Sequence, residues 1–400
     1  MVMIMIKREE YINQLIRFKD KELIKVITGI RRCGKSTLFD LYCDYLLENG
    51  VKKEQIIRIN LEDMAYRELD TYTKLYDYIN EKLLSNTMNY IFLDEIQNIE
   101  KFQKACDSLF IKKNVDLYIT GSNAFLLSGE LATLLSGRYV EIKMLPLSFK
   151  EYVSNFTEKN NVDRLFKNYI SYGSFPYTLK FEDADDIEKY VLAIYDSIVL
   201  KDIMARKKFP DYTMLQGVIN FMLDNVGNLC STNKIANTMT SAGRSISVHT
   251  VENYITSLTE SFIFYKASRY DIKGKQYLKT GDKYYVADLG LRYFLLGRKN
   301  GDKGHILENV VYLELKRRGY DVYIGKVDDL EIDFVAINSK GIEYYQVAET
   351  VRDETTLQRE LAPLDAIRDH YPKYILTNDI EPETSYNGIR KINVVDWLLL

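Results

Sequence analysis

The sequence has few cysteines and no long apolar run. Its cysteines are scattered and form no Cys-x-x-Cys pair, which argues against a zinc site and suits a reducing compartment. They are Cys33, Cys43, Cys106 and Cys230. No apolar stretch approaches the roughly 20 residues of a membrane-spanning helix. The opening MVMIMIKREE also has too few consecutive apolar residues to form the core of a signal peptide. We therefore expect a cytoplasmic protein without membrane association.

The chain also lacks an excess of basic charge. A formal net charge of −3 over 400 residues argues against binding nucleic acid through overall charge, although it leaves room for a local basic face. Internal repeats and low-complexity segments are missing as well. The length exceeds what one compact core usually holds and predicts about two to four domains.

The clearest motif lies at residues 23–37, LIKVITGIRRCGKST. An apolar strand leads to Gly29, and the loop closes at Gly34 before a helical pattern begins, which is the order of a P-loop, GxxxxGK[ST]. Glycines let backbone N–H groups surround phosphate oxygens, Lys35 can reach the β and γ phosphates, and Ser36 can hold Mg²⁺. The other loop residues expected to bind ATP are Arg32, Cys33 and Thr37. We expect Cys33 to serve only as a small residue of the loop; a redox-sensitive thiol is the less favoured alternative.

A second motif, YIFLDEIQ, carries two acidic residues. Residues 90–93 are an unbroken apolar run, typical of a strand buried in a parallel sheet, and Asp94 and Glu95 follow at its carboxyl end. We assign Asp94 to the Mg²⁺ shell and Glu95 to activation of the attacking water. The alternative is a solvated acidic turn that caps a helix.

Two further polar residues are weaker candidates. Asn123 follows the apolar strand VDLYIT and could orient the hydrolytic water or read the γ phosphate; the alternative is a turn residue. Arg138 opens an alternating strand after Gly137 and could stabilise charge on the γ phosphate, in its own subunit or from a neighbour. The alternative is a surface arginine.

The motifs GIRRCGKST, YIFLDEIQ, YITGSN, LLSGRYVEIKMLPLSFKEY and YGSFP together resemble the prokaryotic AAA+ ATPases of the archaeal-type ATPase superfamily, relatives of the STAND and origin-recognition ATPases. The resemblance extends over nearly all of the chain and is most specific at residues 23–152. It implies an α/β fold with a parallel AAA+ sheet over residues 1–152. It also implies a Walker A motif at residues 29–37, a Walker B motif at Asp94 and Glu95, a sensor at Asn123 and an arginine-finger candidate at Arg138.

Two regions follow this core. Residues 153–215 are predicted to be helices around a break at GSFP and would form the helical lid, where Lys201 and Arg206 lie in a helix without an assigned sensor role. Residues 216–300 are similar to a winged helix, with two strands around a wing at KGK. The expected recognition helix has no Lys or Arg between residues 248 and 260, so interdomain packing is favoured over DNA binding. DNA phosphates would have to be met by Arg244, Lys266, Arg269, Lys273 and Lys275.

Residues 301–400 alternate helix and strand and resemble the C-terminal domain of the same ATPases, a degenerate restriction-endonuclease fold of the PD-(D/E)XK type. In that motif carboxylates bind metal and a lysine positions the nucleophile. Glu308 and Asp333 fit the first two places, but the third reads Gln346, Val347 and Ala348, without the carboxylate or the lysine. Glu349 is one residue out of phase and would face the other side of the strand. We predict a retained fold without nuclease chemistry.

These observations predict an ATP-hydrolysing protein that uses Mg²⁺ and whose nucleotide state repositions the winged-helix and C-terminal domains. The alternative is a nucleotide-regulated switch for a DNA or protein partner with little turnover. An ATP-dependent nuclease is the least favoured, because of Gln346 and Ala348. The sequence names no protein partner, and it leaves a homo-oligomer open because Arg138 could act across an interface.

Overall fold

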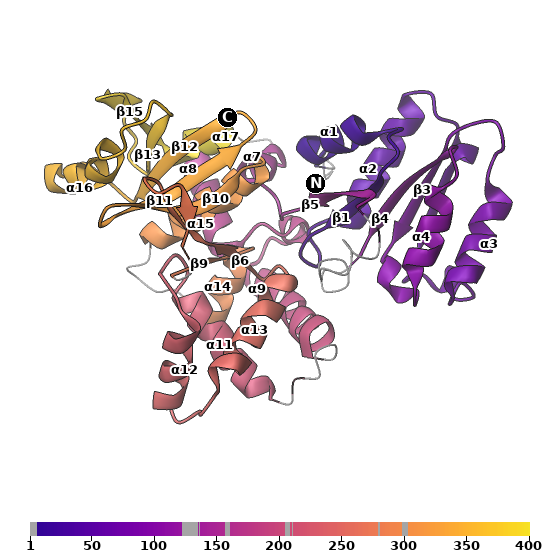
Figure 1. Cartoon of the computed structure of the whole chain (residues 1–400), viewed down its shortest axis with the longest axis horizontal. Coiled ribbons are helices and arrows are strands. Elements are labelled where there is room, and N and C mark those ends of the chain that lie inside the picture. The colour runs from indigo at the N-terminus through magenta and orange to yellow at the C-terminus, as the bar shows by residue number, and fades with distance from the viewer. Residues whose placement is uncertain are drawn as a thin grey trace. The chain divides into compact units, whose positions relative to one another are not determined.

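The structure is a computed structural model that describes residues 6–121, 135, 137–156, 161–204, 209, 211–278, 281–297 and 303–400 (Figure 1). The chain divides into two compact units, Met1–Pro146 and Leu147–Leu400. The domain boundaries expected at residues 152, 215 and 300 stay predictions. Within the described residues, no helix is both long enough and apolar enough to cross a membrane.

The first unit is a parallel sheet between helices, as expected for a P-loop fold. Its elements are α1 (Glu9–Phe18), β1 (Ile24–Thr28), α2 (Lys35–Glu48), β2 (Ile56–Asn60), α3 (Tyr72–Lys82), β3 (Asn89–Asp94), α4 (Phe102–Phe110), β4 (Val115–Thr120) and β5 (Tyr139–Lys143). The strand order is β2-β3-β4-β1-β5, and every neighbouring pair is parallel. The carboxyl ends of β1, β3 and β4 therefore meet at one edge of the sheet, where ligands bind in folds of this class.

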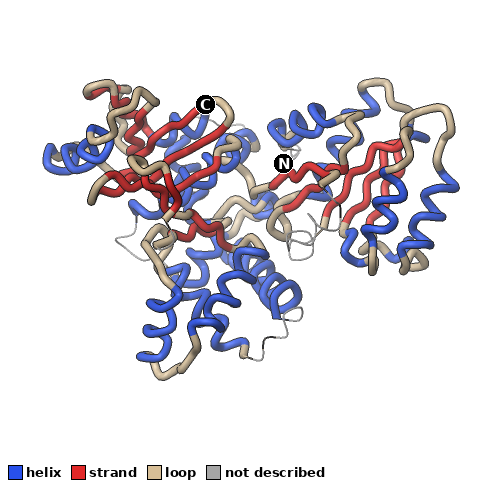
Figure 2. The backbone as a smooth tube through the Cα atoms, in the orientation of Figure 1, coloured by secondary structure: helices blue, strands red, loops and turns tan. Residues whose placement is uncertain are grey.

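Both faces of this sheet are buried, which explains its unbroken apolar strands. Side chains alternate along β3, so that Ile91 and Leu93 join the core with α3 and α4, while Phe92 turns to the other face. There the Phe92 ring lies 4.7 Å from that of Tyr118 and 5.1 Å from that of Phe39 on α2. Helices flank the red strands of this unit on both sides in Figure 2.

The second unit begins with helices and ends with a larger sheet. Its first elements are α7 (Phe149–Ser154), α8 (Val162–Tyr172), α9 (Ala184–Ser197), the π-helical η6 (Ile198–Met204), α11 (Tyr212–Asp224), α12 (Thr232–Ser241), α13 (Val248–Glu260), β6 (Phe264–Ala267), β7 (Arg269–Asp271), β8 (Gln276–Tyr277), β9 (Lys283–Val286) and α14 (Leu289–Leu296). The remaining elements are α15 (Lys303–Arg317), β10 (Asp321–Val327), β11 (Leu330–Asn338), β12 (Gly341–Ala348), α16 (Glu354–Asp365), β13 (Lys373–Thr377), β14 (Thr384–Tyr386), β15 (Ile389–Asn393) and α17 (Val394–Leu399).

The segment expected to form a free wing is part of a sheet. Strands β6 and β9 pair with each other in antiparallel fashion, as the wing pattern predicts. The hairpin β7–β8 between them instead extends the C-terminal sheet, because β7 pairs in parallel with β10. That sheet has the order β14-β15-β13-β12-β11-β10-β7-β8. Hydrogen bonding to a distant strand, which no local pattern reveals, decides where this hairpin lies.

The motif YGSFP is anchored to the start of α14. The buried carboxylate of Asp288, the N-cap of α14, accepts hydrogen bonds from the backbone N–H and the hydroxyl of Ser174, at 2.5 and 2.8 Å. Gly173 has a φ of +85°, and a Cβ there would lie 2.0 Å from the Asp288 carboxylate, so a side chain has no room. Burial raises the pKa of Asp288 to about 6.

Candidate functional site

The P-loop connects β1 to α2. Gly29 has a φ of +150°, and a Cβ on it would lie 2.1 Å from the carbonyl oxygen of Met144, so only glycine fits there. Gly34, with a φ of +104°, is the residue before α2. The loop therefore leads directly into the amino end of a helix, where free N–H groups and the helix dipole favour anions.

Lys35 lies over this loop. Its side chain is buried, and its ammonium donates hydrogen bonds to the carbonyl oxygens of Gly29 at 2.9 Å and Ile30 at 3.3 Å. The positive charge is thereby held beside the loop that would surround phosphate groups. Cys33 is fully buried.

Arg8 supports the loop from a segment that the sequence analysis did not identify. Its guanidinium donates to the carbonyl oxygens of Cys33 at 3.1 Å and Leu145 at 2.6 Å. The guanidinium also lies 4.9 Å from the ring of Tyr11, whose hydroxyl accepts a hydrogen bond from the Leu145 N–H. No spacing rule connects residues 8, 33 and 145, so the sequence carried no signal for this contact.

Asp94 ends β3 at the same edge of the sheet. It is fully buried, and one of its carboxylate oxygens accepts a hydrogen bond from the Thr120 hydroxyl at the end of β4. Among the described residues, its other oxygen, Oδ2, is buried without a hydrogen-bond partner. A buried anionic oxygen without a donor is costly, and a cation would satisfy it. Asp94 therefore fits the Mg²⁺ that this fold family implies, and Ser36, in the first turn of α2, fits as its second ligand.

Glu95 is held by two neighbours. Its backbone has a φ of +55°, and its N–H donates to the Thr120 hydroxyl at 3.1 Å. The side-chain amide of Gln97 donates to Glu95 Oε2 at 2.5 Å. Thr120 thus connects Asp94 and Glu95, and the sequence analysis missed it, although its place at the end of a strand beside β3 was a usable signal.

Arg58, on β2, is another residue of the site that lies outside the sequence motifs. Its guanidinium donates to the carbonyl oxygen of Ser36 at 3.1 Å and forms an ion pair with Asp40. Burial lowers the pKa of Arg58, and the nearby Asp94 carboxylate acts in the opposite direction. Arg58 therefore joins the first turn of α2 to the strand beside Asp94.

Arg138 lies at the amino ends of the strands, whereas the P-loop lies at their carboxyl ends. The next residue, Tyr139, pairs with Ile24 at the beginning of β1, whereas the P-loop follows the end of that strand. The Arg138 guanidinium lies 5.6 Å from the ring of Phe110. Burial raises the pKa of the nearby Asp107, and the positive charge of Arg138 acts in the opposite direction. The structure thus does not bring Arg138 to the P-loop of its own subunit.

Three residues named in the sequence analysis cannot be placed in the site. Asn123 and Arg206 lie outside the described residues, and the side chain of Lys201 lies outside them as well. Their roles stay predictions.

The nuclease-like positions of the second unit form a buried cluster with a lysine from another strand. Lys283, on β9, lies 3.3 Å from the Glu308 carboxylate and 3.0 Å from that of Glu331. Burial alone would lower the pKa of Lys283, but Glu308, Asp333 and Glu331 outweigh it and raise the pKa. Burial raises the pKa of Asp333, and the charge of Glu308 adds to this effect. Lys283 belongs to no sequence motif of this cluster, because it lies before the C-terminal domain in the chain.

Gln346 occupies the third position of this cluster without supplying a charge. Its amide oxygen accepts a hydrogen bond from the Asp333 N–H at 2.7 Å, and its amide nitrogen donates to Glu360 at 2.9 Å. Ala348 is buried and offers no polar atom. In the part of the chain that the structure describes, no three His, Cys, Asp or Glu residues are grouped so that they could hold a metal ion.

Comparisons with known proteins agree with this geometry. Residues 21–153 match the AAA domain family, and residues 163–302 match a domain of unknown function, DUF8612. The chain belongs to the AAA-domain family. It is 46% identical to an uncharacterized protein of Haemophilus influenzae over 99% of both chains. It is 30% identical to an uncharacterized protein of Methanocaldococcus jannaschii, over 98% of this chain and 89% of that one.

The AAA-domain fold also resembles a solved structure, the Walker-type ATPase PABY2304 of Pyrococcus abyssi. The TM-score is 0.50 at 16% identity, and the alignment covers 72% of this chain and 95% of the other. The family and the α/β fold expected from the motifs are confirmed. The matched AAA span includes the P-loop, Asp94, Glu95 and Thr120, whereas Arg8 precedes it.

Proposed function

We propose that this AAA-domain protein binds ATP and hydrolyses it to ADP and phosphate. The observation that carries the proposal is the buried Asp94 carboxylate with an unpartnered Oδ2, among the described residues, at the sheet edge that also bears the P-loop. A nucleotide with its divalent cation supplies the positive charge that this oxygen lacks.

Each residue has a distinct role in this proposal. Lys35 and the loop amides bind the phosphates, and Ser36 and Asp94 hold Mg²⁺, which neutralises charge on the phosphate oxygens when bound. Glu95 accepts a proton from the attacking water. Asn123 and Arg138 respond to the γ phosphate, and Arg138 does so from a neighbouring subunit of a homo-oligomer.

The second candidate is a nucleotide-regulated switch with little turnover, in which bound nucleotide repositions the winged-helix and C-terminal domains. The hydrogen bond from Gln97 to Glu95 favours it, because a carboxylate engaged by an amide is less available to water. DNA is the less favoured partner of either candidate, because the hairpin β7–β8 is engaged in the C-terminal sheet and the exposed face of α13 carries Glu252.

Steady-state ATPase measurements on the purified chain, with and without duplex DNA, test these candidates. Glu95→Gln should bind ATP and lose turnover by at least about a hundredfold, because proton transfer contributes about 10²–10⁴-fold. Glu100→Gln, at an exposed position five residues on, is the matched control and should keep full turnover. Wild-type protein that binds ATP without turnover under any condition would reject hydrolysis and leave the switch.

A further inference from the structure

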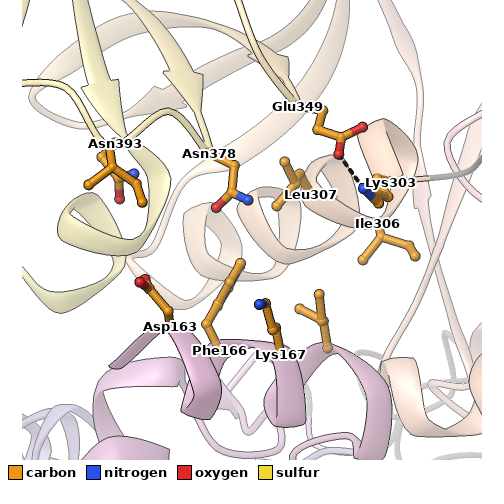
Figure 3. Close-up of a pocket in the computed structure, with 11 residues that line it drawn as sticks. Asp163, Phe166, Lys167, Lys303, Ile306, Leu307, Glu349, Asn378 and Asn393 are labelled. Atoms are coloured by element: carbon orange, nitrogen blue, oxygen red, sulfur yellow. Dashed lines mark hydrogen bonds and ion pairs between the residues drawn. The ribbon is translucent and has the colours of Figure 1, made fainter. Parts of the chain in front are cut away.

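A cavity of about 280 Å³ lies in the second unit, far along the chain from the P-loop (Figure 3). One wall is the face of α8 that carries Asp163, Phe166 and Lys167, and the opposite wall comes from α15. Glu349, Asn378 and Asn393 line it from the ends of β12, β13 and β15, which run parallel. Carboxyl ends of parallel strands are the usual place for a ligand in an α/β sheet.

The floor of the cavity is apolar. Phe166 and Leu307 are almost completely buried, at 4% exposure each, and Ile170 and Ile306 are half-buried beside them. The polar groups stand above this floor, and Figure 3 shows the side chains of Asp163 and Lys167 directed into the cavity. The site thus has an apolar part for a hydrocarbon group and a charged part for polar groups.

The charges in the cavity balance. Lys303 is neutralised by Glu349 at 2.6 Å. Asp163 and Lys167 lie four residues apart on α8, one turn of the helix, where opposite charges usually pair. Among the described residues, neither side chain makes a hydrogen bond or an ion pair. Within the described part of the chain, the Asp163 carboxylate and the Lys167 ammonium therefore face the cavity unpaired, about 5–6 Å apart at their Cβ atoms.

We propose that this cavity binds a free α-amino acid with an apolar side chain. The ligand carboxylate pairs with Lys167, its ammonium pairs with Asp163, and its side chain lies on Phe166 and Leu307. The Asn378 amide, which points into the cavity, supplies a donor and an acceptor to the same head group. A nucleotide fits poorly, because its phosphates need uncompensated positive charge and the volume of about 280 Å³ lies just below the roughly 300–1,000 Å³ of most ligand pockets.

Calorimetric titration of the full chain with leucine, methionine and phenylalanine tests the proposal. Leucine should bind, while 4-methylpentanoate, which lacks the ammonium, and 3-methylbutylamine, which lacks the carboxylate, should each bind about tenfold more weakly or worse. Glycine should bind weakly because it leaves the apolar floor uncovered.

Two variants test which side chain pairs with the carboxylate of the ligand and which pairs with its ammonium. Lys167→Gln should weaken leucine about tenfold and leave 3-methylbutylamine unchanged, while Asp163→Asn should weaken leucine and leave 4-methylpentanoate unchanged. Arg164→Gln, at an exposed neighbouring position on α8 outside the cavity, is the matched control and should bind leucine as wild type does. Thermal unfolding of all three variants should match wild type, since these side chains are exposed.

The proposal is overturned if none of the three amino acids binds up to about 10 mM, the weak-binding range. It is also overturned if leucine binds equally well to Lys167→Gln and Asp163→Asn, or if AMP binds this cavity more tightly than leucine and loses affinity on Lys167→Gln.

Discussion

Thr120 is the residue through which the two acidic side chains of the candidate active site are held together. Its single hydroxyl donates to Asp94 and accepts from the Glu95 N–H. One oxygen of Asp94 is satisfied in this way, whereas Oδ2 has no hydrogen-bond partner in the part of the chain that the structure describes. Thr120 therefore orients both acidic residues.

Thr120→Val keeps the shape of this side chain and removes both hydrogen bonds. We expect turnover to fall about tenfold or more and the Mg²⁺ concentration at half-maximal rate to rise, because the Asp94 carboxylate loses the donor that orients it. ATPase rates measured over a Mg²⁺ titration check this. Thr120→Ser retains the hydroxyl and should behave as wild type does; equal activity of the Val and Ser variants would contradict the role of Thr120.

Asp288 is a single residue that makes stability depend on pH. Its pKa is raised from 3.8 to about 6 in the folded chain. Between these values the unfolded chain releases the proton and the folded chain keeps it, so stability falls as the pH rises. The protonated carboxyl thus stabilises the fold below about pH 4, and this contribution is lost through about pH 6. Two pKa units correspond to about 3 kcal/mol.

Urea unfolding of wild type and Asp288→Asn between about pH 4 and pH 7 measures this effect. The free energy of unfolding of wild type minus that of the variant should decrease by up to about 3 kcal/mol over this range. Ser247→Ala, at the exposed N-cap of α13, is the control: it removes a cap but no titratable group, so its difference should not change with pH. A flat difference for Asp288→Asn as well would show that its pKa is not raised.

At the scale of elements, β1 and β4 are joined by a buried ion pair at the end of the sheet away from the P-loop. Lys25 and Asp116 are both buried, and Asp116 also accepts hydrogen bonds from the Tyr118 hydroxyl at 2.8 Å and the Asp20 N–H at 2.9 Å. Burial lowers the pKa of Lys25, and the Asp116 charge opposes this. The pair therefore depends on both partners being present.

Asp116→Asn leaves the Lys25 ammonium buried without a counter-charge. We expect the free energy of unfolding to fall by about 3–5 kcal/mol, the usual cost of removing one partner of a buried pair. Asp70→Asn breaks the exposed pair with Lys74 and should leave the free energy of unfolding nearly unchanged, because water screens this pair. Chemical denaturation of the two variants compares them directly, and similar losses for both would contradict the importance of burial.

Element pairing also limits the DNA-binding hypothesis. The hairpin β7–β8 carries Lys273 and Lys275, which would have to contact the phosphates if DNA were bound. Lys273 is engaged with Asp328 at 2.5 Å, and β7 is hydrogen-bonded to β10. A wing that belongs to a neighbouring sheet is less free to enter a groove of DNA.

At the scale of the whole molecule, the position of Arg138 makes the assembly of subunits testable. Arg138 lies at the amino ends of the strands and the P-loop at their carboxyl ends, so an arginine finger can act only between subunits. If it does, the ATPase rate per subunit should rise with protein concentration. Size measurements across the same range should show the oligomer.

Mixing variants gives a sharper result. Arg138→Ala and Lys35→Ala should each lose at least about tenfold in turnover alone. Their mixture should recover activity, because a Lys35→Ala subunit can donate Arg138 to an intact P-loop. A mixture no more active than its parts would reject action between subunits.

The sequence by itself determined the P-loop, the acidic pair after β3 and the parallel sheet. These features are local: glycines at Gly29 and Gly34 permit positive φ angles, and unbroken apolar strands arise where both sheet faces are buried. The spacing of residues 29–37 already carries the phosphate-binding chemistry. A separate resemblance, to the restriction-endonuclease motif, predicted Glu308 on a helix and Asp333 on a strand, where they lie in α15 and β11.

Only the tertiary structure decided which distant residues complete these sites. Arg8 reaches Leu145, Thr120 reaches Asp94, and Lys283 reaches Glu308, through contacts between residues far apart in the chain. It also decided that β7 pairs with β10 and that Asp163 and Lys167 share a cavity with Asn378. A local pattern sets the faces of a helix or strand, but the choice of partner depends on how all the elements pack, because long-range hydrogen bonds and burial form only in the folded chain.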